Sequence, residues 1–545
     1  MFICSKLNEL KKIQSLFLIV LILSFSNCAK KGRPSGGPMD EDPPLFVTAD
    51  PPYESINFNK DEINIYFNEY IKLKKLNDQL VISPPLNPAN PSLISPQGSP
   101  SKFINIKILD TLLENTTYIF DFGSSIVDNN ESNKLERFKY VFSTGNYIDS
   151  LTLSGSVKNA YKSEDIKNIK LLLYRLDSSY TDSAVYNRKP NYVTSTLDSS
   201  NYQFSNLRKG QYLLVGLNDL RNDYLFNPST DEIGFLNDTI SLPRDTLINR
   251  SIPIFKEELP YKFKRGKEIK KGQLIFGYQG KPSNLTIKTL SEVPKDFSII
   301  YYKEKEKDTL NLWHTPIEKD SLIFKVSNKN SIDTVIIKLR KKKLDSLIIT
   351  ELNRSILNYK DTLFFAANNP IIKLDTSKIN FVDADTIKIP YSPFISKKES
   401  KIGFLFKKEL NTNYRLNLYP SALTDIFNQT NDTVSAQFRT RGLDDYGEII
   451  LAIQNPESVP VIIQLIDVND KTVTQEITSK TENITFNYLL PKKYKIRIIH
   501  DTNKNGKWDT GNYLKKRQPE TIEFYPETIE LRANWSINEI IKIKS

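Results

Sequence analysis

Cysteine and histidine are nearly absent from this chain of 545 residues. The two cysteines are Cys4 and Cys28, and the two histidines are His314 and His500. We expect Cys4 to be removed with a leader and Cys28 to be modified, so the mature chain cannot form an internal disulfide. Two histidines argue against a zinc site or a serine–histidine–aspartate triad, and glycine-rich phosphate loops are missing. The composition therefore predicts a chain without enzymatic activity.

Charge of one sign does not dominate the chain. The formal net charge is +11, and charged residues make up 26% of the sequence. Basic residues are not interleaved with aromatic ones as in nucleic-acid-binding surfaces, so we expect no nucleic-acid partner. With 545 residues the chain exceeds the size of one hydrophobic core, and about three to five domains are expected.

The first 27 residues have the pattern of a secretory signal peptide. A positive region, which contains Lys6, Lys11 and Lys12, precedes an apolar run over 13–25 that is too short to span a bilayer. Only Ser26 and Asn27 separate Cys28 from this run. The segment resembles a bacterial lipoprotein signal, although Asn27 stands where that family usually has Gly, Ala or Ser. The resemblance implies that Cys28 begins the mature chain and carries lipid; a plain signal peptide with an incidental cysteine is the alternative.

Residues 28–44 are rich in glycine, proline and charge, which predicts a flexible tether between the lipid and the folded part. The lipidated Cys28 would attach the chain to the membrane. We expect a lipid-anchored protein of the outer membrane, on the cell surface or on the periplasmic face. Behind this anchor, the chain is expected to form a long rod of modules.

From Leu45 onward, apolar residues alternate with polar ones, as in Ile63, Ile65 and Phe67. Alternation over five or six residues is typical of strands with one buried face. Turn residues separate these runs, and strands at such spacing predict β-sandwiches. We therefore predict an all-β fold, a tandem array of Ig-like and prealbumin-like sandwiches behind a lipoprotein signal.

Two pairs of segments recur in the same order along the chain. The segment 113–118 resembles 410–414, and 142–145 resembles 438–442. Further along, Phe204, Tyr212 and Asp219 have the same spacing as Phe486, Tyr494 and Asp501. This order predicts five modules, named here A1 (45–147), B1 (148–255), X (256–350), A2 (351–443) and B2 (444–545), with X a β-sandwich of uncertain type.

The segments 34–44, 115–118 and 142–145 together resemble the Ig-like lipoproteins of the Bacteroidota whose first domain is of the SbsA Ig-like type. The likeness continues through 431–433 and 505–509 to 532–535. The B modules are similar to prealbumin-like or carboxypeptidase-regulatory-like sandwiches. The resemblance implies outer-membrane attachment and no catalysis. It also suggests a scaffold or accessory subunit of an envelope complex, with outer-membrane β-barrel assembly as the specific hypothesis.

One loop in B2 is a candidate metal site. Asp501, Asn503, Asn505 and Asp509 occupy positions 1, 3, 5 and 9 of a possible calcium loop, and Gly506 stands at position 6. Position 12 holds an asparagine where a bidentate glutamate is expected, so binding would be weak. The alternative is an Asx-rich turn between strands. Apart from this possible Ca²⁺ we expect no cofactor.

Two other functional classes remain open. A cell-surface adhesin or glycan-binding protein is the main alternative to a scaffold. A hydrolase lacks a nucleophile–base set in this sequence. Of the tryptophans, Trp508 and Trp535 are expected to pack in B2, with stacking on sugars as the alternative, and Trp313-His314 is expected to be a packed pair.

Overall fold

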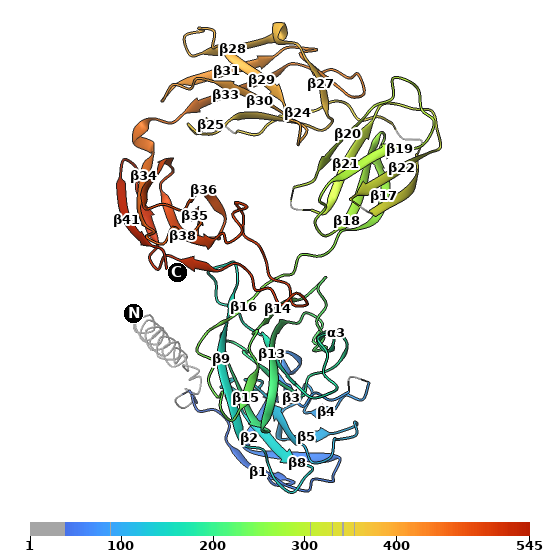
Figure 1. Cartoon of the computed structure of the whole chain (residues 1–545), viewed down its shortest axis with the longest axis vertical. Coiled ribbons are helices and arrows are strands. Elements are labelled where there is room, and N and C mark those ends of the chain that lie inside the picture. Colours follow the sequence, from blue (N-terminus) through green and yellow to red (C-terminus); the bar gives the residue numbers. More distant parts are fainter. Residues whose placement is uncertain are drawn as a thin grey trace, which may run out of the picture. The chain divides into compact units, whose positions relative to one another are not determined.

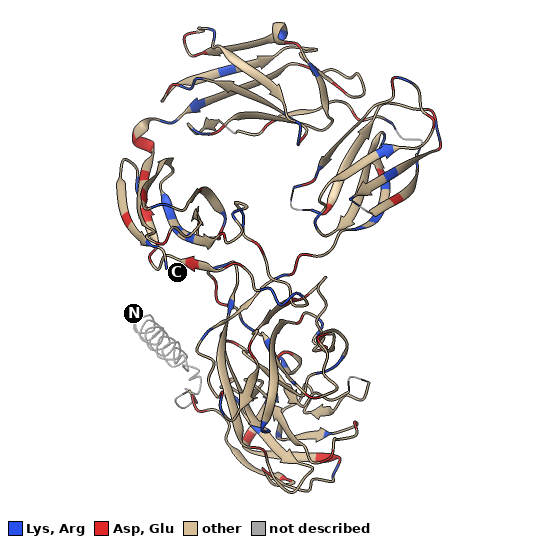
Figure 2. Cartoon of the chain, viewed as in Figure 1, with Lys and Arg blue, Asp and Glu red and all other residues tan. Residues whose placement is uncertain are grey.

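The protein was analysed as a computed structural model that describes residues 39–544, apart from residues 88, 306, 330, 341, 342 and 354. The regular secondary structure of the described part is almost entirely β-strand, and the strands form separate small sheets (Figure 1). The predicted all-β class with tandem sandwiches is therefore confirmed. Acidic and basic residues are interspersed along the strands and loops (Figure 2). The chain divides into two compact units, one with residues up to 80 and 89–147, the other with 81–88 and 148–545.

The first unit contains module A1. Its main sheet has the order β1-β2-β5-β4, with β7 paired to β2, and β6 pairs with β8. The predicted alternation holds, because Ile63, Ile65 and Phe67 of β2 are buried. The elements are β1 (Phe46–Asp50), β2 (Glu62–Leu73), α2 (Leu76–Gln79), β4 (Leu93–Ser95), β5 (Ser101–Lys107), β6 (Thr117–Asp121), β7 (Ile126–Asp128) and β8 (Lys139–Ser143).

Module A2 repeats this plan with a broken strand. Its sheets have the orders β24-β26-β30-β29 and β25-β33-β31-β28, and β27 pairs with β32. The long β2 of A1 corresponds to β26 and β27, which are separated at Pro370, a residue that cannot donate to a strand ladder. The elements are β24 (Ile349–Glu351), β25 (Ile356–Leu357), β26 (Leu363–Ala367), β27 (Ile371–Leu374), η1 (Thr376–Lys378), β28 (Ile379–Asp383), β29 (Tyr391–Ile395), β30 (Lys401–Phe406), β31 (Asn413–Leu418), β32 (Leu423–Asp425), β33 (Val434–Thr440) and η2 (Leu443–Asp445).

A1 and A2 share one hydrogen-bond network at a strand end. In A1 the hydroxyl of Tyr118 accepts from the Leu113 amide at 2.9 Å, and the hydroxyl of Thr144 donates to the Leu113 carbonyl at 2.7 Å. In A2, Tyr414 and Thr440 make the same two bonds with Glu409, at 2.8 and 2.6 Å. The structure thus aligns Leu113 with Glu409, which corrects the sequence match to Leu410 by one residue.

B1 and B2 have the same topology. B1 combines a sheet β11-β10-β13-β14, with β15 on β13, and a sheet β12-β9-β16; in B2 the orders are β36-β35-β38-β39, with β40 on β38, and β37-β34-β41. The last strand runs parallel to the first in both. The B1 elements are β9 (Leu151–Asn159), β10 (Lys170–Arg175), α3 (Ala184–Asn187), β11 (Tyr192–Ser195), β12 (Asn201–Leu207), β13 (Gly210–Asn218), β14 (Glu232–Phe235), β15 (Ile240–Leu242) and β16 (Ile252–Ile254). The B2 strands are β34 (Gly447–Gln454), β35 (Val461–Ile466), β36 (Thr472–Thr478), β37 (Glu482–Leu489), β38 (Lys492–His500), β39 (Ile522–Phe524), β40 (Ile529–Leu531) and β41 (Ser536–Lys542).

The repeated tyrosine of the B modules has one role in both. Tyr212 and Tyr494 are buried, and each hydroxyl donates to the carbonyl four residues earlier, Arg208 at 2.8 Å and Leu490 at 2.7 Å. Such a tyrosine corner fixes the turn before a central strand. A further short strand, β3 (Val81–Ser83), groups with the second unit, because Val81 packs in the core of B1.

Module X contains two antiparallel sheets, β17-β18-β21-β20 and β19-β22-β23. Alternate residues of β18 and β22 point into its core, among them Phe276 and Phe324, whose rings meet edge to face at 5.4 Å. The strands are β17 (Lys262–Lys270), β18 (Gln273–Gln279), β19 (Leu285–Thr289), β20 (Ile299–Lys303), β21 (Thr309–His314), β22 (Ser321–Asn328) and β23 (Ser331–Lys338).

Aromatic contacts join successive modules within the second unit. Trp313 of X clusters with Ile426 and Phe427 of A2, and Tyr359 of A2 stacks on Tyr488 of B2 at 4.4 Å. B2 also packs against B1, far back along the chain, as described below. The expected simple rod is therefore wrong for this unit, because B2 contacts a module that is not its neighbour in sequence.

Candidate functional site

The four predicted calcium ligands lie together in the connection between β38 and β39. Asp501 is buried, and its two carboxylate oxygens accept from the amides of Asn505 at 3.0 Å and Gly506 at 2.8 Å. The side-chain amides of Asn503 and Asn505 both donate to Oδ2 of Asp509. Burial raises the pKa of Asp509, but these amide donors outweigh burial, and its pKa lies below the ordinary value. The carboxylate is therefore held ionised.

A carboxylate absent from the predicted set completes the loop. Glu520 is buried, and it accepts from the backbone amides of Thr502 and Asp509, both at 2.9 Å. It stands beyond position 12, so a fixed calcium-loop spacing could not identify it. Glu520 closes the loop from the opposite side through backbone hydrogen bonds.

The donor chemistry of this loop suits calcium in part. Two carboxylates and two amide groups converge, which matches the oxygen ligands that calcium takes. The amide nitrogens of Asn503 and Asn505, however, face Asp509. Both amides would have to turn so that their oxygens face an ion, and in the described residues no three acidic, histidine or cysteine side chains form a metal cluster. The observed bonding is that of the Asx-rich turn.

The matching loop in B1 begins with Asp219, which accepts from the amides of Arg221 at 3.1 Å and Tyr224 at 2.7 Å. Burial raises the pKa of Asp219, although the hydrogen bond from Tyr224 opposes this effect. Arg221 occupies the third position of this loop, where its cation would oppose a metal ion. The first aspartate is thus a turn residue in both modules.

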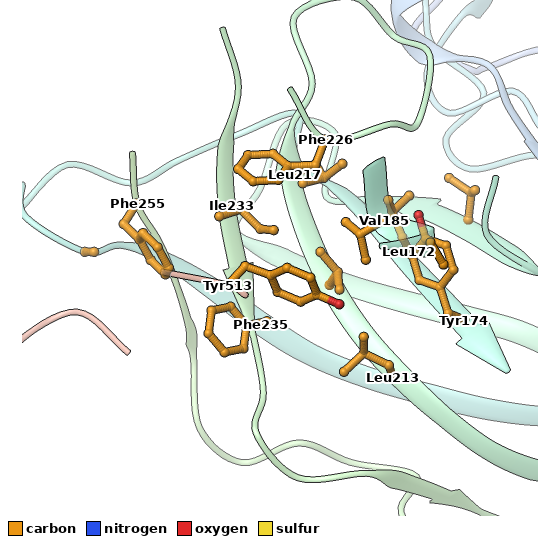
Figure 3. Packing of buried hydrophobic residues seen from close by; sticks show 14 of the residues in the cluster. Leu172, Tyr174, Val185, Leu213, Leu217, Phe226, Ile233, Phe235, Phe255 and Tyr513 are labelled. Atoms are coloured by element: carbon orange, nitrogen blue, oxygen red, sulfur yellow. The ribbon is translucent and has the colours of Figure 1, made fainter. Parts of the chain in front are cut away.

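The same B2 connection carries a feature that the sequence did not reveal. After Asp509 the chain crosses to B1, and Tyr513 enters the hydrophobic core of that module (Figure 3). Its side chain is fully buried, and its ring meets Phe235 edge to face at 5.3 Å. The Tyr513 amide donates to Glu257 at 2.5 Å, and the hydroxyls of Tyr513 and Tyr180 are 3.1 Å apart. We call residues 509–518 the arm.

Neighbouring residues of the arm fit the surface of B1 closely. Gly511 lies so near the Phe255 ring that a Cβ at this position would overlap it. Thr510 donates to the carbonyl of Lys256 at 2.6 Å, and the Gln518 side chain donates to the carbonyl of Phe235 at 2.9 Å. The arm therefore contacts B1 through its backbone as well as through the ring of Tyr513.

A second contact between B1 and B2 is polar. Arg497 of β38 is fully buried, and the face of Tyr161 from B1 lies 4.0 Å from its guanidinium carbon. The guanidinium donates to Gln464 at 2.8 Å and to the Tyr161 hydroxyl at 3.0 Å. Asp470 accepts from the amide of Ser163 at 3.0 Å in the same interface. A buried cation held by neutral acceptors and an aromatic face depends on every one of them.

The tryptophans divide between interfaces and solvent. Trp508 packs against Tyr161 at 4.9 Å, and its indole donates to the Glu520 carbonyl at 3.0 Å. Trp535 is 51% exposed, so the expectation that it packs inside B2 is wrong; Arg532 lies over its ring at 5.0 Å. His314 is buried beside Trp313, as expected for a packed pair, and burial lowers its pKa.

Comparison with known proteins connects A1 to a family. A family model described as a bacterial Ig-like domain matches residues 40–144. The matched residues cover almost all of A1 and the five residues before it, so A1 is similar to a bacterial Ig-like domain. Similar solved structures of other proteins include the S-layer protein rSbsC(31-844), which is 12% identical. The match covers 89% of the present chain and 67% of the S-layer chain, at a TM-score of 0.14. The Bacillus anthracis TIE protein is 10% identical, with 94% and 77% covered and a TM-score of 0.14. No curated protein matches the sequence of this chain.

The predicted lipid anchor, Cys28, lies outside the described residues together with the signal 1–27. Lipidation thus stays a prediction, as does the prealbumin-like character of the B modules. Among the described residues, no helix has both the length and the apolar character needed to cross a membrane.

Proposed function

We propose that the protein is a non-catalytic envelope scaffold, anchored through Cys28, which acts as an accessory subunit of a membrane complex. The observation that carries this proposal is the contact between B1 and B2, in which Tyr513 fills the core of a module more than 250 residues earlier in sequence. Burying such residues between modules keeps several modules in one arrangement, which suits a protein that holds partners. Assembly of outer-membrane β-barrels is the specific role that we propose, on the sequence resemblance.

The anchor is tested first. Membrane fractionation of the native chain and of Cys28→Ser should show the native protein in the membrane pellet and the variant in the soluble fraction. Ser26→Ala, two residues before the cysteine, is the matched control and should leave the protein in the pellet. Retention of Cys28→Ser in the membrane would remove lipid anchoring from the proposal.

Purification of a tagged full chain in mild detergent tests the partner. We expect a β-barrel membrane protein to co-purify with the native chain. The Tyr513→Ala variant, in which the arm is weakened, should recover less of it, whereas the exposed substitution Leu220→Ala should recover the native amount. Isolation of the chain alone, with an intact anchor, would contradict the scaffold function.

We also propose that the loop 501–509 binds calcium weakly. The oxygen-bearing side chains of Asp501 and Asp509 support this, and binding would order the loop from which the arm extends. With calcium about tenfold above the dissociation constant, the gain is about 1.4 kcal/mol, or a rise in melting temperature of roughly 2–4 °C. The full chain should show this rise at millimolar calcium, and Asp501→Ala should abolish it while Asp219→Ala should not. An unchanged melting temperature of the native chain would leave only the structural turn.

A cell-surface glycan-binding role is the second candidate, and one face of A1 favours it. Tyr66 of β2 and Phe103 of β5 stand opposite each other and exposed, with ring centroids 5.7 Å apart. The next row pairs Asn64 with Asn105, and the Asn105 amide donates to Asn64 at 2.9 Å and to Glu62 at 2.5 Å. Flat aromatic rings beside amides can stack on sugar rings and bond their hydroxyls.

A glycan array separates this candidate from the scaffold. Under the glycan-binding reading, the native chain should retain specific glycans, and Phe103→Ala should lose them. Ile336→Ala, which removes a similarly exposed apolar residue from X, should retain them. An array without retained glycans, or equal retention by Phe103→Ala, would exclude this face as a sugar site.

A further inference from the structure

A pocket of about 400 Å³ opens in module A2, at the strands β25, β31 and β33. Its size falls in the range of small-molecule sites, roughly 300–1,000 Å³. Its lining includes two arginines, Arg415 and Arg439, and two amide side chains, Asn413 and Gln437. All four side chains are exposed, and none belongs to the sites described above.

Strand register places the four polar residues on one face. Arg439 of β33 pairs with Asn413 of β31, and Gln437 pairs with Arg415. Ile356 of β25 adjoins Arg439 on the other side. The two arginines are thus diagonal neighbours on adjacent strands, at which Cα atoms lie about 7–8 Å apart. Long arginine side chains at that spacing can reach one ligand group together.

Neither guanidinium is neutralised inside the protein. In the described part of the chain, no carboxylate lies within ion-pair distance of Arg415 or Arg439, and the Asn413 and Gln437 side chains make no internal hydrogen bond. Asp383 lines the pocket, but its carboxylate accepts from the amides of Asp385 at 3.0 Å and Ile387 at 2.8 Å in its own turn. The pocket therefore presents donors that lack acceptors.

Module A1 shows that the fold does not require these charges. The Tyr–Thr network shared by the two modules aligns Arg415 with Ile119 and Gln437 with Val141, and it aligns Asn413 with Thr117 and Arg439 with Ser143. These counterparts in A1 are uncharged and buried. The two arginines are an addition to the common framework, on a face that is buried in A1 and exposed in A2.

We propose that this pocket binds a sugar that carries an oxyanion, either a carboxylate or a phosphate. Guanidinium groups recognise both oxyanions through paired N–H donors. Asn413 and Gln437 supply amide donors and acceptors for the hydroxyls of the same ring. The site is independent of the scaffold proposal and of the aromatic face of A1.

Isothermal titration of the full chain with three probes tests this inference. Glucuronic acid and glucose 6-phosphate carry the two oxyanions, and glucose carries none. We expect one or both charged sugars to bind at least about tenfold more tightly than glucose, a difference of about 1.4 kcal/mol. The stronger of the two identifies carboxylate or phosphate as the natural group.

Variants locate the binding. Arg415→Gln and Arg439→Gln should each weaken the charged sugar at least about tenfold, and Gln437→Glu, which adds a carboxylate between them, should abolish binding. Lys373→Gln removes an exposed charge from the same module outside the pocket and should bind as the native chain does. Since all these side chains are exposed, circular dichroism should be unchanged. Absence of binding at tens of millimolar sugar, equal binding of glucose, or native affinity in both arginine variants would each overturn the proposal.

Discussion

B1 and B2 have the same strand order and the same tyrosine corner, and they differ in one connection. In B1, residues 219–231 join two strands and fold back on their own module, where Tyr224 packs against the core. In B2, residues 501–521 make the same connection, and their greater length carries the arm into B1. The duplicated interior therefore sets the sandwich, while the length of one loop decides which other module it contacts.

The A modules also share their interior, and they differ on one face of a sheet. Their interiors share stacked ring pairs, Tyr118 with Phe142 at 5.5 Å and Tyr414 with Phe438 at 5.6 Å. At the positions of Arg415 and Arg439 on the other face of these strands, A1 has Ile119 and Ser143, which are uncharged and buried. In both duplicated types, the shared interior positions keep the fold, and the copies differ in one loop or on one sheet face.

Among the substitutions that test the difference between B1 and B2, Tyr513→Ala should have the largest effect on stability. Removing a buried aromatic ring costs about 3–5 kcal/mol, here drawn from the contact between the modules rather than from B2 itself. Hydrogen exchange should accelerate about 100-fold or more in the arm and in β14, while β34 and β37 keep native protection.

Leu220→Ala is the matched control, because Leu220 is exposed in the corresponding connection of B1. It should leave exchange unchanged throughout. Native protection of the arm in Tyr513→Ala would mean that the other contacts hold the modules together without this ring.

Tyr161→Ala should cause the second-largest loss of stability. It removes a hydroxyl acceptor and the ring face from Arg497, which would leave a buried cation partly unsatisfied, at a cost of about 3 kcal/mol. Tyr161→Phe keeps the ring and should cost only about 1 kcal/mol. Thermal denaturation of the two variants should show this order, and equal melting temperatures would assign no role to the ring face.

Tyr212→Phe and Tyr494→Phe test whether the repeated tyrosines of B1 and B2 contribute equally to stability, because their hydroxyls make equivalent hydrogen bonds. Each substitution removes one buried hydrogen bond and should lower the stability of its own module by about 1 kcal/mol. Hydrogen exchange can measure each module separately within the full chain. A difference of more than about 1 kcal/mol between the two would show that the repeated tyrosines are not energetically equivalent.

The smallest expected effect on stability comes from Glu257, which accepts a hydrogen bond from the Tyr513 amide. Burial raises the pKa of Glu257, although the Tyr513 amide and Arg517 oppose it. A carboxyl with a raised folded pKa disfavours the folded state once ionised. Stability of the B1–B2 contact should therefore increase as pH falls through the folded pKa towards the unfolded value near 4.5.

Glu257→Gln keeps an acceptor for Tyr513 and removes the titration. Its arm should exchange slightly more slowly than that of the native chain at pH 7, with a weaker dependence on pH between 4 and 7. An equal pH dependence in the native chain and the variant would assign the effect to other groups.

Sequence reasoning identified what depends on local pattern. Alternating residues such as Ile63 and Ile65 predicted strands because each residue reports its own face. The recurring tyrosines predicted the duplication, and the aspartates and asparagines of 501–509 lie together because they are neighbours in sequence. These features need no knowledge of distant segments.

Long-range contacts escaped prediction for the corresponding reason. Tyr513 stands among polar residues, and its burial depends on Phe235 and Phe255 of another module. Arg497 reads as an outward strand residue until Tyr161 covers it. Trp535 shows the opposite error, since an aromatic residue near a strand was taken as packed and is exposed. The length of 501–521 relative to 219–231 was the only local signal of the arm.

The contact between B1 and B2 also has a mechanical consequence. Tension applied between residue 148 and residue 544 would pass from B1 to B2 through the arm and the Arg497–Tyr161 contact, and it would bypass modules X and A2. Only after this contact ruptured would the load reach the two bypassed modules and add their length to the chain. The B1–B2 contact would thus protect X and A2 from tension for as long as it holds.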